Sequence, residues 1–510
     1  METFRIPYQE TKKFSKLVVD YLNKNEKLQP FINHFPSLEN IEKQIVEKEK
    51  HKVNRSVLVK VLKEQNSSII LSKNSDENIE FLLDENTFTI TTGHQLCLFT
   101  GPLYFIYKII SSINLVEQLK DKYPEKNFVP IFWMASEDHD FEEVNHINLF
   151  GRKISWESEQ YGAVGRMKLN GFQNVLDELK QILGESENAQ KLIHLFENAY
   201  LNHSTLSDAS RYLVNELFGR YGLVILDADD KRLKDQFISV IKKDVLQKGF
   251  VTAIQNCSNE LSKYYKIQAY ARDINFFKLS DNKRELIKES SDKKDIENNP
   301  EQFSPNVLMR PLYQEMILPN IAYIGGAAEV SYWMQLKTAF EQEGIPFPIL
   351  LLRNSAMIIN GKQEQKFKNF GFKIEDLFLS EEELKKKYVL SQSQSDISLE
   401  NEKAKLENVY NNIAEKTSDI GLKNRIFSQL KKQLNTLNDL EQKLIREEKK
   451  KYQNSLNQIE KIKNQLFPNN SLQERHDNFI PFYLKDGENF LERIKSNFDP
   501  LSPNFVVLSF

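Results

Sequence analysis

The chain has 510 residues, enough for two or three domains built around a large core. Its 69 basic and 72 acidic residues give a formal net charge of -3, so bulk charge predicts binding neither to nucleic acid nor to an anionic membrane. There is no apolar signal core and no run of about 18 apolar residues, so neither secretion nor a membrane span is expected. The two cysteines, Cys97 and Cys257, form neither a metal-type spacing nor a disulfide framework, which fits a reducing cytoplasm.

The first part of the chain predicts a helical segment followed by a βαβ unit. Residues 1–85 carry apolar side chains at helical spacing and read as a lead-in packed on the core. A β-branched strand at 87–92 is followed by a helix from 102 to about 119 and by a nearly continuous apolar strand at 128–134. A strand, a crossover helix and a second buried strand predict a parallel sheet that is covered on both faces.

The turn after the first strand is a candidate ligand site. It contains Gly93, His94 and Gln95, and Thr100 and Gly101 lie just before the helix. Free backbone NH groups and a helix N-terminus beside polar side chains suit a phosphate or carboxylate ligand. The alternative is an ordinary strand-to-helix turn.

The second strand runs into an acidic cluster that contains Glu137, Asp138, His139 and Asp140. Ligand sites in open α/β sheets lie beyond the carboxyl ends of the strands, so this cluster is expected beside the turn at 93–95. As an alternative, it could be a solvated loop and helix start. If 139–146 is helical, His139, Glu143 and His146 share a face that could bind a metal, but the spacing matches no usual zinc motif and no metal site is predicted.

The middle of the chain repeats the pattern of strand and helix. Residues 151–205 form a mixed inserted segment with a helix around 173–200, and a helix at 207–220 leads to a strand at 222–230 that ends in carboxylates. The segment 231–300 is charged and is predicted to be a largely helical insertion, ending in an exposed, mobile loop at 290–300.

Three further strand ends are predicted at 307–311, 321–326 and 349–355. They supply polar or flexible residues to the same edge of the sheet: Arg310, Gly325, Gly326, Arg353, Asn354 and Ser355. The glycine pair lies before a helix at about 328–343 and would let the backbone approach a ligand closely. The two arginines are expected either to bind an anion or to act as hydrogen-bonded braces.

Residues 380–468 differ in character from the core. Glycine almost disappears, charges dominate, and apolar residues recur by threes and fours, which predicts an antiparallel coiled-coil projection or an oligomer seam. The tail, 469–510, closes with an apolar strand after Pro503 that is expected to return to the core. The predicted organisation is therefore a core at 1–379, a coiled coil at 380–468 and a returning tail.

Several sequence blocks together carry a family resemblance. They are Gly93-His94-Gln95 with Thr100-Gly101-Pro102-Leu103-Tyr104, Phe132-Trp133 with Glu137-Asp138-His139-Asp140-Phe141, Ser304-Pro305-Asn306-Val307 with Arg310-Pro311, Ala322-Tyr323-Ile324-Gly325-Gly326 with Ala328-Glu329 and Tyr332-Trp333, and Gln473-Glu474-Arg475 with Asn478. As a set they resemble the cysteine ligases of bacillithiol biosynthesis, the BshC family, over nearly the whole chain. The resemblance implies a Rossmann-like core related to class I nucleotidyl-transferring enzymes, inserted connecting segments, a coiled-coil domain and a homodimer. Cys97 stands where a small residue such as alanine is expected, which bears on packing.

The resemblance also implies a reaction in which cysteine is joined to the amine of glucosaminyl malate. We expect Gly93, His94 and Gln95 to face a phosphate or activated carboxylate, and Asp138, His139 or Asp140 to hold or deprotonate the amine. Further binding residues are expected at Thr100, Gly101, Glu137, Arg310, Gly325, Gly326, Glu329, Tyr332, Arg353, Asn354 and Ser355. ATP with magnesium is implied only by the ligase reaction and the fold resemblance, since no P-loop signature is present.

Two other functions are compatible with the sequence. A nucleotidyltransferase or an enzyme like the aminoacyl-tRNA synthetases would need a basic RNA surface and a lysine-bearing loop after the last core strand, but 352–355 contains no lysine. A non-catalytic coiled-coil assembly protein would have an occluded crevice at the ends of strands 87–92 and 128–134.

Overall fold

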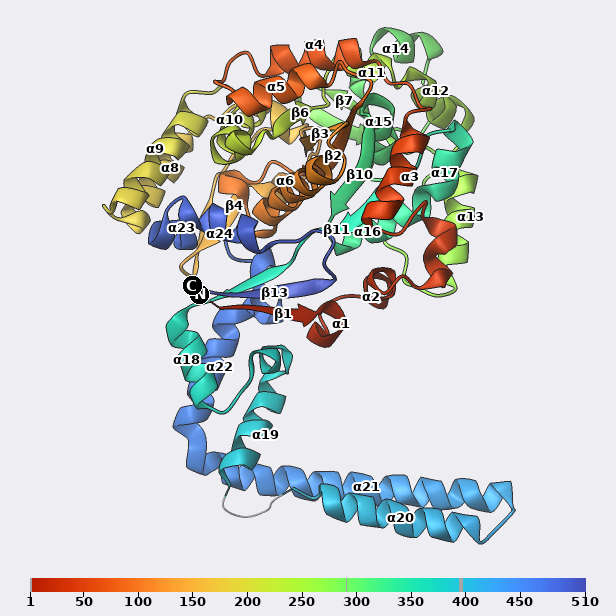
Figure 1. Cartoon of the computed structure of the whole chain (residues 1–510), viewed down its shortest axis with the longest axis vertical. Helices are drawn as coiled ribbons and strands as arrows, with labels where there is room; N and C mark the ends of the chain where they lie inside the picture. Colours follow the sequence, from red (N-terminus) through yellow and green to blue (C-terminus); the bar gives the residue numbers. More distant parts are fainter. Residues whose placement is uncertain (1, 290, 394–397) are drawn as a thin grey trace. The chain divides into compact units, whose positions relative to one another are not determined.

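The computed structural model describes residues 2–289, 291–393 and 398–510. The chain divides into two compact units. The larger unit comprises Arg5–Ala356 and Glu474–Val506, and the smaller comprises Met1–Phe4, Met357–Gln473 and Val507–Phe510. Figure 1 shows the elements of both units, coloured along the chain.

The larger unit is built on a five-stranded sheet with the order β11-β10-β2-β3-β6. Its strands are β2 (Thr87–His94), β3 (Asn127–Met134), β6 (Val224–Asp227), β10 (Asn320–Gly325) and β11 (Ile349–Leu352). All neighbouring pairs are parallel. Read from β6, the order is third, second, first, fourth and fifth along the chain, which is the Rossmann order. The expected Rossmann-like parallel core is therefore confirmed.

Helices cover both faces of this sheet. On one face, α3 (Leu38–Lys48) and α6 (Tyr104–Lys122) share a buried apolar cluster with β2 and β3. Figure 1 shows α6 lying along these strands. On the other face, Tyr313 of α15 (Arg310–Ile317) meets the ring of Trp133 at a centroid distance of 5.5 Å. Because both faces are buried, strands such as β3 and β11 consist of nearly continuous apolar residues.

The remaining helices of the larger unit surround this core. They are α1 (Tyr8–Thr11), α2 (Lys16–Leu22), α4 (Arg55–Gln65), α5 (Lys73–Phe81), α7 (Phe141–Val144), α8 (Phe172–Leu183), α9 (Glu187–Leu201), α10 (Leu206–Phe218), α11 (Lys231–Asp235), α12 (Ile238–Gln247), α13 (Val251–Ser262), α14 (Lys293–Asn298), α16 (Ala327–Trp333), α17 (Lys337–Glu343), α23 (Ile480–Asp486) and α24 (Asn489–Asn497). Two small antiparallel sheets accompany them, β4 (His146–Leu149) with β5 (Arg152–Ser155), and β7 (Phe276–Ser280) between β8 (Lys283–Leu286) and β9 (Phe303–Pro305).

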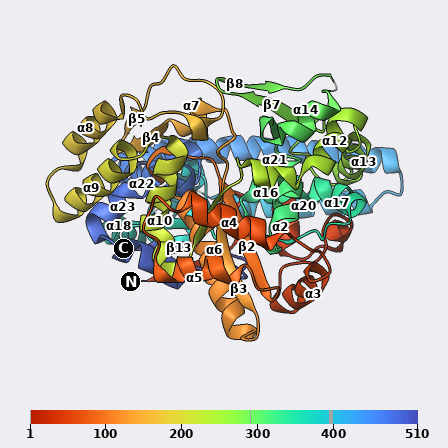
Figure 2. The same cartoon turned by 90° about the horizontal axis from the view of Figure 1, so that it is seen from above.

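Several expected elements differ in the structure. The helix expected at 173–200 is two helices, α8 and α9, which lie side by side (Figure 1, Figure 2), because Gly184 takes φ 74° between them. The expectation of a largely helical 231–300 was wrong for its second half, which holds the β7–β8 hairpin. The mobile loop expected at 290–300 was also wrong, because α14 occupies most of it; residue 290 lies outside the described residues.

The strand expected at 307–311 was wrong as well. Residue 310 begins α15, and the preceding strand, β9, ends at Pro305 and belongs to a small sheet. Pro311 follows at a first-turn position of the helix, where a missing N–H costs nothing, so the proline marks a helix start and not a strand end.

The smaller unit is mainly helical, as expected for a coiled-coil domain. It contains α18 (Gly361–Asn369), α19 (Glu381–Gln392), α20 (Glu400–Glu415), α21 (Ile420–Lys449) and α22 (Gln453–Leu466). The longest helix, α21, spans about 45 Å at 1.5 Å per residue, and α20 lies alongside it (Figure 1). The tail strand β13 (Asn504–Ser509) joins β1 (Thr3–Pro7) and β12 (Ala356–Ile359) in a separate sheet. Among the described helices, none is long and apolar enough to cross a membrane.

Candidate active site

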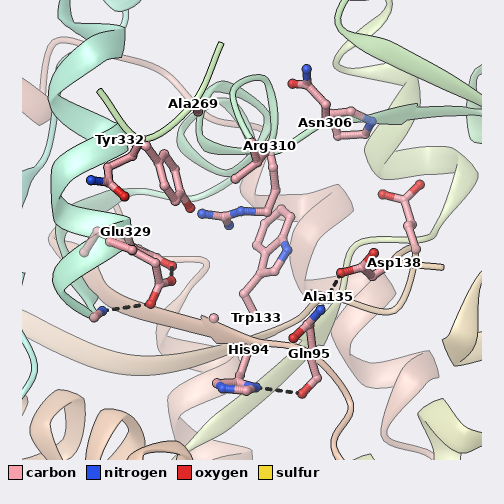
Figure 3. A pocket seen from close by; sticks show the side chains of 18 of the residues that line it. His94, Gln95, Trp133, Ala135, Asp138, Ala269, Asn306, Arg310, Glu329 and Tyr332 are labelled. Carbon is pink, nitrogen blue, oxygen red and sulfur yellow. Dashed lines mark hydrogen bonds between the residues drawn. The ribbon is translucent and has the colours of Figure 1, made fainter. Parts of the chain in front are cut away.

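A pocket of about 980 Å³ lies at the carboxyl ends of the central strands of the larger unit. The strands β2 and β10 are neighbours, but the chain leaves them toward opposite edges of the sheet, and ligands of Rossmann folds bind at such a switch point. Figure 3 shows the side chains that converge there. The pocket brings together many of the residues predicted from sequence: Gly93, His94, Gln95, Glu137, Asp138, Arg310, Gly326, Glu329, Tyr332 and Arg353.

An ion pair joins α6 and α16, the helices that follow the two strands at the switch point. Lys108 of α6 donates to the carbonyl oxygen of Gly93 at 2.9 Å and pairs with Glu329 of α16. Glu329 also accepts from Tyr323 Oη at 2.7 Å and from Gly326 N at 2.8 Å. Burial opposes ionisation of Glu329, but Lys108 and these hydrogen bonds lower its pKa to about 2. Glu329 is therefore an ionised brace of the pocket wall.

Sequence reasoning missed Lys108. The residue lies in the apolar run of α6, where its side chain is only 6% exposed. The available signal was a lysine in an otherwise buried helix directly after the Gly-His-Gln turn, because a buried lysine needs an anionic partner.

His94 lies at the end of β2 and is a neutral imidazole. Its Nδ1 lies 3.0 Å from the carbonyl oxygen of Gln95, which fixes Nδ1 as the protonated nitrogen. The rings of Tyr104 and Phe105 flank it. Burial, with the charge of Lys108 nearby, lowers the pKa of His94 to about 3. Since Nε2 forms no hydrogen bond within the described part of the chain, His94 offers the pocket an acceptor but is a weak proton base.

Asp138 is a second ionised carboxylate of the pocket. Its Oδ2 accepts from Gln95 Nε2 at 2.8 Å, and its Oδ1 lies 3.7 Å from Arg284. Burial opposes ionisation, but the hydrogen bond from Gln95 and the charge of Arg284 lower the pKa of Asp138. An anionic carboxylate on the wall of a pocket is suited to holding an ammonium group.

Arg310 and Arg353 present buried guanidinium groups from the other side of the pocket. Arg310 lies among aromatic rings: its guanidinium carbon is 5.3 Å from the centre of the Tyr323 ring and 5.7 Å from the centre of the Trp133 ring. Figure 3 shows Arg310 beside Trp133. Its Nη2 is buried without a hydrogen-bond partner, and so is Nε of Arg353. Arg353 is otherwise held by Glu474 at 2.8 Å. Buried N–H groups without partners are costly, so these two point to an anionic ligand.

Three further cations line the pocket but were absent from the predicted site. They are Arg272, Arg284 and Arg475. The side chains of Arg272 and Arg475 are exposed and form no salt bridge or hydrogen bond with any described residue. Only Arg475 had a signal in the sequence, because it belongs to one of the blocks that carry the family resemblance.

Several predicted site residues do not line the pocket. Thr100 and Gly101 lie in the turn before α6, where Asn478 Nδ2 donates to the carbonyl oxygen of Gly101 at 2.6 Å. Gly325 is the buried last residue of β10. Asn354 accepts from Ser111 Oγ at 3.1 Å, and the backbone N–H of Ser355 donates to Tyr8 Oη at 3.1 Å. These contacts are those of structural braces.

His139 and Asp140 are exposed and also lie outside the pocket lining. His139 Nδ1 lies 3.1 Å from Arg284 Nη1. The helix that would align His139 with Glu143 and His146 is only Phe141–Val144, and His146 begins β4. Within the described residues, no group of three or more His, Cys, Asp or Glu side chains is arranged to hold a metal ion.

Comparison with known proteins identifies the family. Residues 1–354 match the model described as the N-terminal Rossmann-like domain of bacillithiol biosynthesis BshC, and residues 356–510 match its C-terminal coiled-coil domain. Proteins named "Putative cysteine ligase BshC" from Flavobacterium psychrophilum and Flavobacterium johnsoniae are each 44% identical, covering 100% of this chain and 99% and 100% of theirs. One from Bacillus cereus is 26% identical over 94% of this chain and 95% of its own. With both family models matched and full-length relatives at this identity, the chain belongs to the BshC family of bacillithiol biosynthesis.

Proposed function

We propose that this chain is a ligase that joins the carboxylate of cysteine to the amine of glucosaminyl malate as an amide. The observation that carries the proposal is the opposition of charge within one pocket at the switch point. Asp138 supplies an ionised carboxylate, and Arg310 and Arg353 each supply a buried N–H group without a partner. Both substrates carry an amine together with one or more carboxylates, so each needs a site with both signs of charge.

The residues of the pocket divide into two roles under this proposal. Asp138, oriented by Gln95, holds the ammonium group of the acceptor. Arg310 and Arg353 bind the carboxylates or the activating group, and His94 accepts a hydrogen bond through Nε2. With a pKa of about 3, His94 is too weak a base to take up a proton from the amine, so its proposed role is to face the phosphate or activated carboxylate.

We further propose that the same pocket binds a phosphate-bearing activator such as ATP. The two unpartnered guanidinium N–H groups suit phosphate oxygens. A Cβ at Gly326 would lie 3.3 Å from Glu329 Oε2 and 4.0 Å from Arg353 Nε, so glycine keeps this corner open. A nucleoside triphosphate would supply the activation of the cysteine carboxylate. We propose that Arg310 and Arg353 hold its phosphates and that the nucleotide binds together with magnesium.

The assembly-protein alternative predicted an occluded crevice at the ends of β2 and β3. The structure instead has a large pocket there, which favours a catalytic role. We further propose that the protein is a cytoplasmic homodimer. The exposed apolar side chains of α21 and the two free cysteines support this.

The direct test incubates the purified protein with cysteine, glucosaminyl malate and ATP and detects bacillithiol by mass spectrometry. Asp138→Asn should lower product formation about 10- to 100-fold, because a charge-assisted hydrogen bond to the ammonium group is lost. Asp140→Asn is the matched control, since Asp140 is exposed and outside the pocket, and it should leave the rate unchanged. Absence of product with the wild-type protein would contradict the proposal. Equal losses in both variants would remove Asp138 from the site.

A further inference from the structure

Glu137 and Asp138 are adjacent carboxylates on the wall of the same pocket, but their oxygens are occupied differently. Each oxygen of Asp138 already accepts one hydrogen bond, Oδ2 from Gln95 at 2.8 Å and Oδ1 from the backbone N–H of His139 at 2.7 Å, and each keeps a lone pair for a further donor. Glu137 accepts from Lys234 through Oε1 at 2.5 Å. Its Oε2 accepts no hydrogen bond from the described residues. One carboxylate oxygen of Glu137 is therefore available to a ligand.

Lys234 holds Glu137 in place from beneath the pocket. Its side chain is fully buried in α11, donates to the carbonyl oxygen of Phe303 at 2.9 Å and lies 5.1 Å from the centre of the Tyr313 ring. These contacts hold the ammonium group of Lys234 in one position, and its hydrogen bond to Glu137 therefore also fixes Oε1 of Glu137. Lys234 is a positioning residue that does not line the pocket.

The other groups that face Glu137 come from three elements. They are Asp229 after β6, Arg284 of β8 and Arg166, which forms two hydrogen bonds of 2.7 Å to Asp229. Arg284 is occupied by Ser304 and His139. Burial is the largest influence and raises the pKa of Glu137, although Lys234 opposes the rise. Neighbouring Asp138 has a lowered pKa, so the two carboxylates are pushed apart in basicity, as in paired acid–base sites.

We propose that Glu137 is the general base that removes a proton from the substrate ammonium group, with Lys234 as its positioning residue and Asp138 as the anchor of the same ammonium. The N–H bond breaks, its electron pair stays on nitrogen, and the proton forms an O–H bond with Glu137 Oε2. The neutral amine then has the lone pair needed to attack the activated carboxylate, and Glu137 releases the proton to solvent. This inference rests on the proposed ligase function.

The first test replaces Glu137 and measures rate and binding separately. Glu137→Gln keeps an acceptor for Lys234 but cannot take up a proton. Product formation should fall about 100-fold or more, while the affinity for glucosaminyl malate, measured by calorimetry, stays within about threefold because Asp138 still binds the ammonium. Glu137→Asp keeps the charge that faces Lys234 and should also lose about tenfold or more, because the shorter carboxylate is misplaced.

The second test reads the pH profile. Lys234→Met removes a positive charge that opposes protonation of Glu137, so the acidic limb of kcat/KM should move to higher pH. The control is Lys48→Met, which breaks another fully buried ion pair, with Glu315, away from the pocket; it should lower stability without moving the limb.

The outcomes separate this inference from the proposed function. A wild-type protein that makes no product contradicts the function and, with it, the inference. A wild-type protein that makes product while either Glu137 variant turns over within about threefold of it overturns the inference alone, since loss of a general base costs more. The inference alone is also overturned if the acidic limb of kcat/KM lies at the same pH in Lys234→Met and Lys48→Met.

Discussion

Replacing Lys108 by methionine should destabilise the larger unit by breaking the ion pair that joins α6 to α16. The partner, Glu329, is 22% exposed and has its pKa lowered from 4.5 to about 2 in the folded protein. At about 1.4 kcal/mol per pH unit, this difference corresponds to about 3 kcal/mol of favourable interaction with Glu329, much of which depends on Lys108. Burial also lowers the pKa of Lys108, so the cost of desolvating its ammonium group offsets part of this gain. The thermal midpoint at pH 7 should therefore fall by several degrees.

The pH dependence of this loss identifies its cause. Because the folded pKa of Glu329 is depressed, its contribution is present above pH 4.5 and is lost as the pH falls toward 2. The difference between wild type and Lys108→Met should consequently be full at pH 7 and shrink below pH 4.5. The control is Lys52→Met, from an exposed pair with Glu85, which should change stability by less than about 0.5 kcal/mol. Equal midpoints for both variants, or a difference that does not change with pH, would refute the reasoning.

Two other substitutions test the state of His94 and the role of α21. Burial lowers the pKa of His94 from 6.5 to about 3, so the folded state is destabilised as the pH falls from 6.5 toward 3. His94→Gln should reduce the pH dependence of the unfolding free energy in this range by about 1.4 kcal/mol per pH unit. If the melting temperatures of the variant and the wild type depend on pH in the same way, His94 is not neutral in the folded protein. Leu440 and Leu444 are 47% and 45% exposed on α21. Changing both to lysine should convert a homodimer into a monomer of unchanged helicity. Light scattering that still reports a dimer would place the interface elsewhere.

The sequence by itself determined the main elements and the general location of the site. Strands β3, β10 and β11 were predictable because strands buried on both faces consist of nearly continuous apolar residues. Strand β2 was predictable from its β-branched residues. That the turn at 93–95 and the residues Glu137 and Asp138 after β3 line one pocket was predictable, because parallel strands end at one edge of the sheet. The change in composition near 380 likewise indicated the coiled coil. A narrow apolar stripe on a helix requires apolar residues at a spacing of three and four, and this spacing can be seen in the sequence itself.

Only the tertiary structure decided which polar side chains face the pocket and which are braces. Lys108 meets Glu329, Arg353 meets Glu474 and Lys234 meets Glu137, and no local pattern connects the members of these pairs. For the same reason, Asn354 and Ser355, which follow a strand end as suggestively as Arg353 does, turned out to be held by remote residues outside the pocket.

The different basicities of two adjacent carboxylates were also beyond the sequence. Glu137 and Asp138 are chemically similar neighbours, but the first is buried against a lysine of α11 and the second is hydrogen-bonded by the residue that follows β2. Their pKa values move in opposite directions because burial and nearby charge depend on distances in space. The amino-acid order fixes which groups exist near a strand end, and the packing of distant elements around them shifts their pKa values.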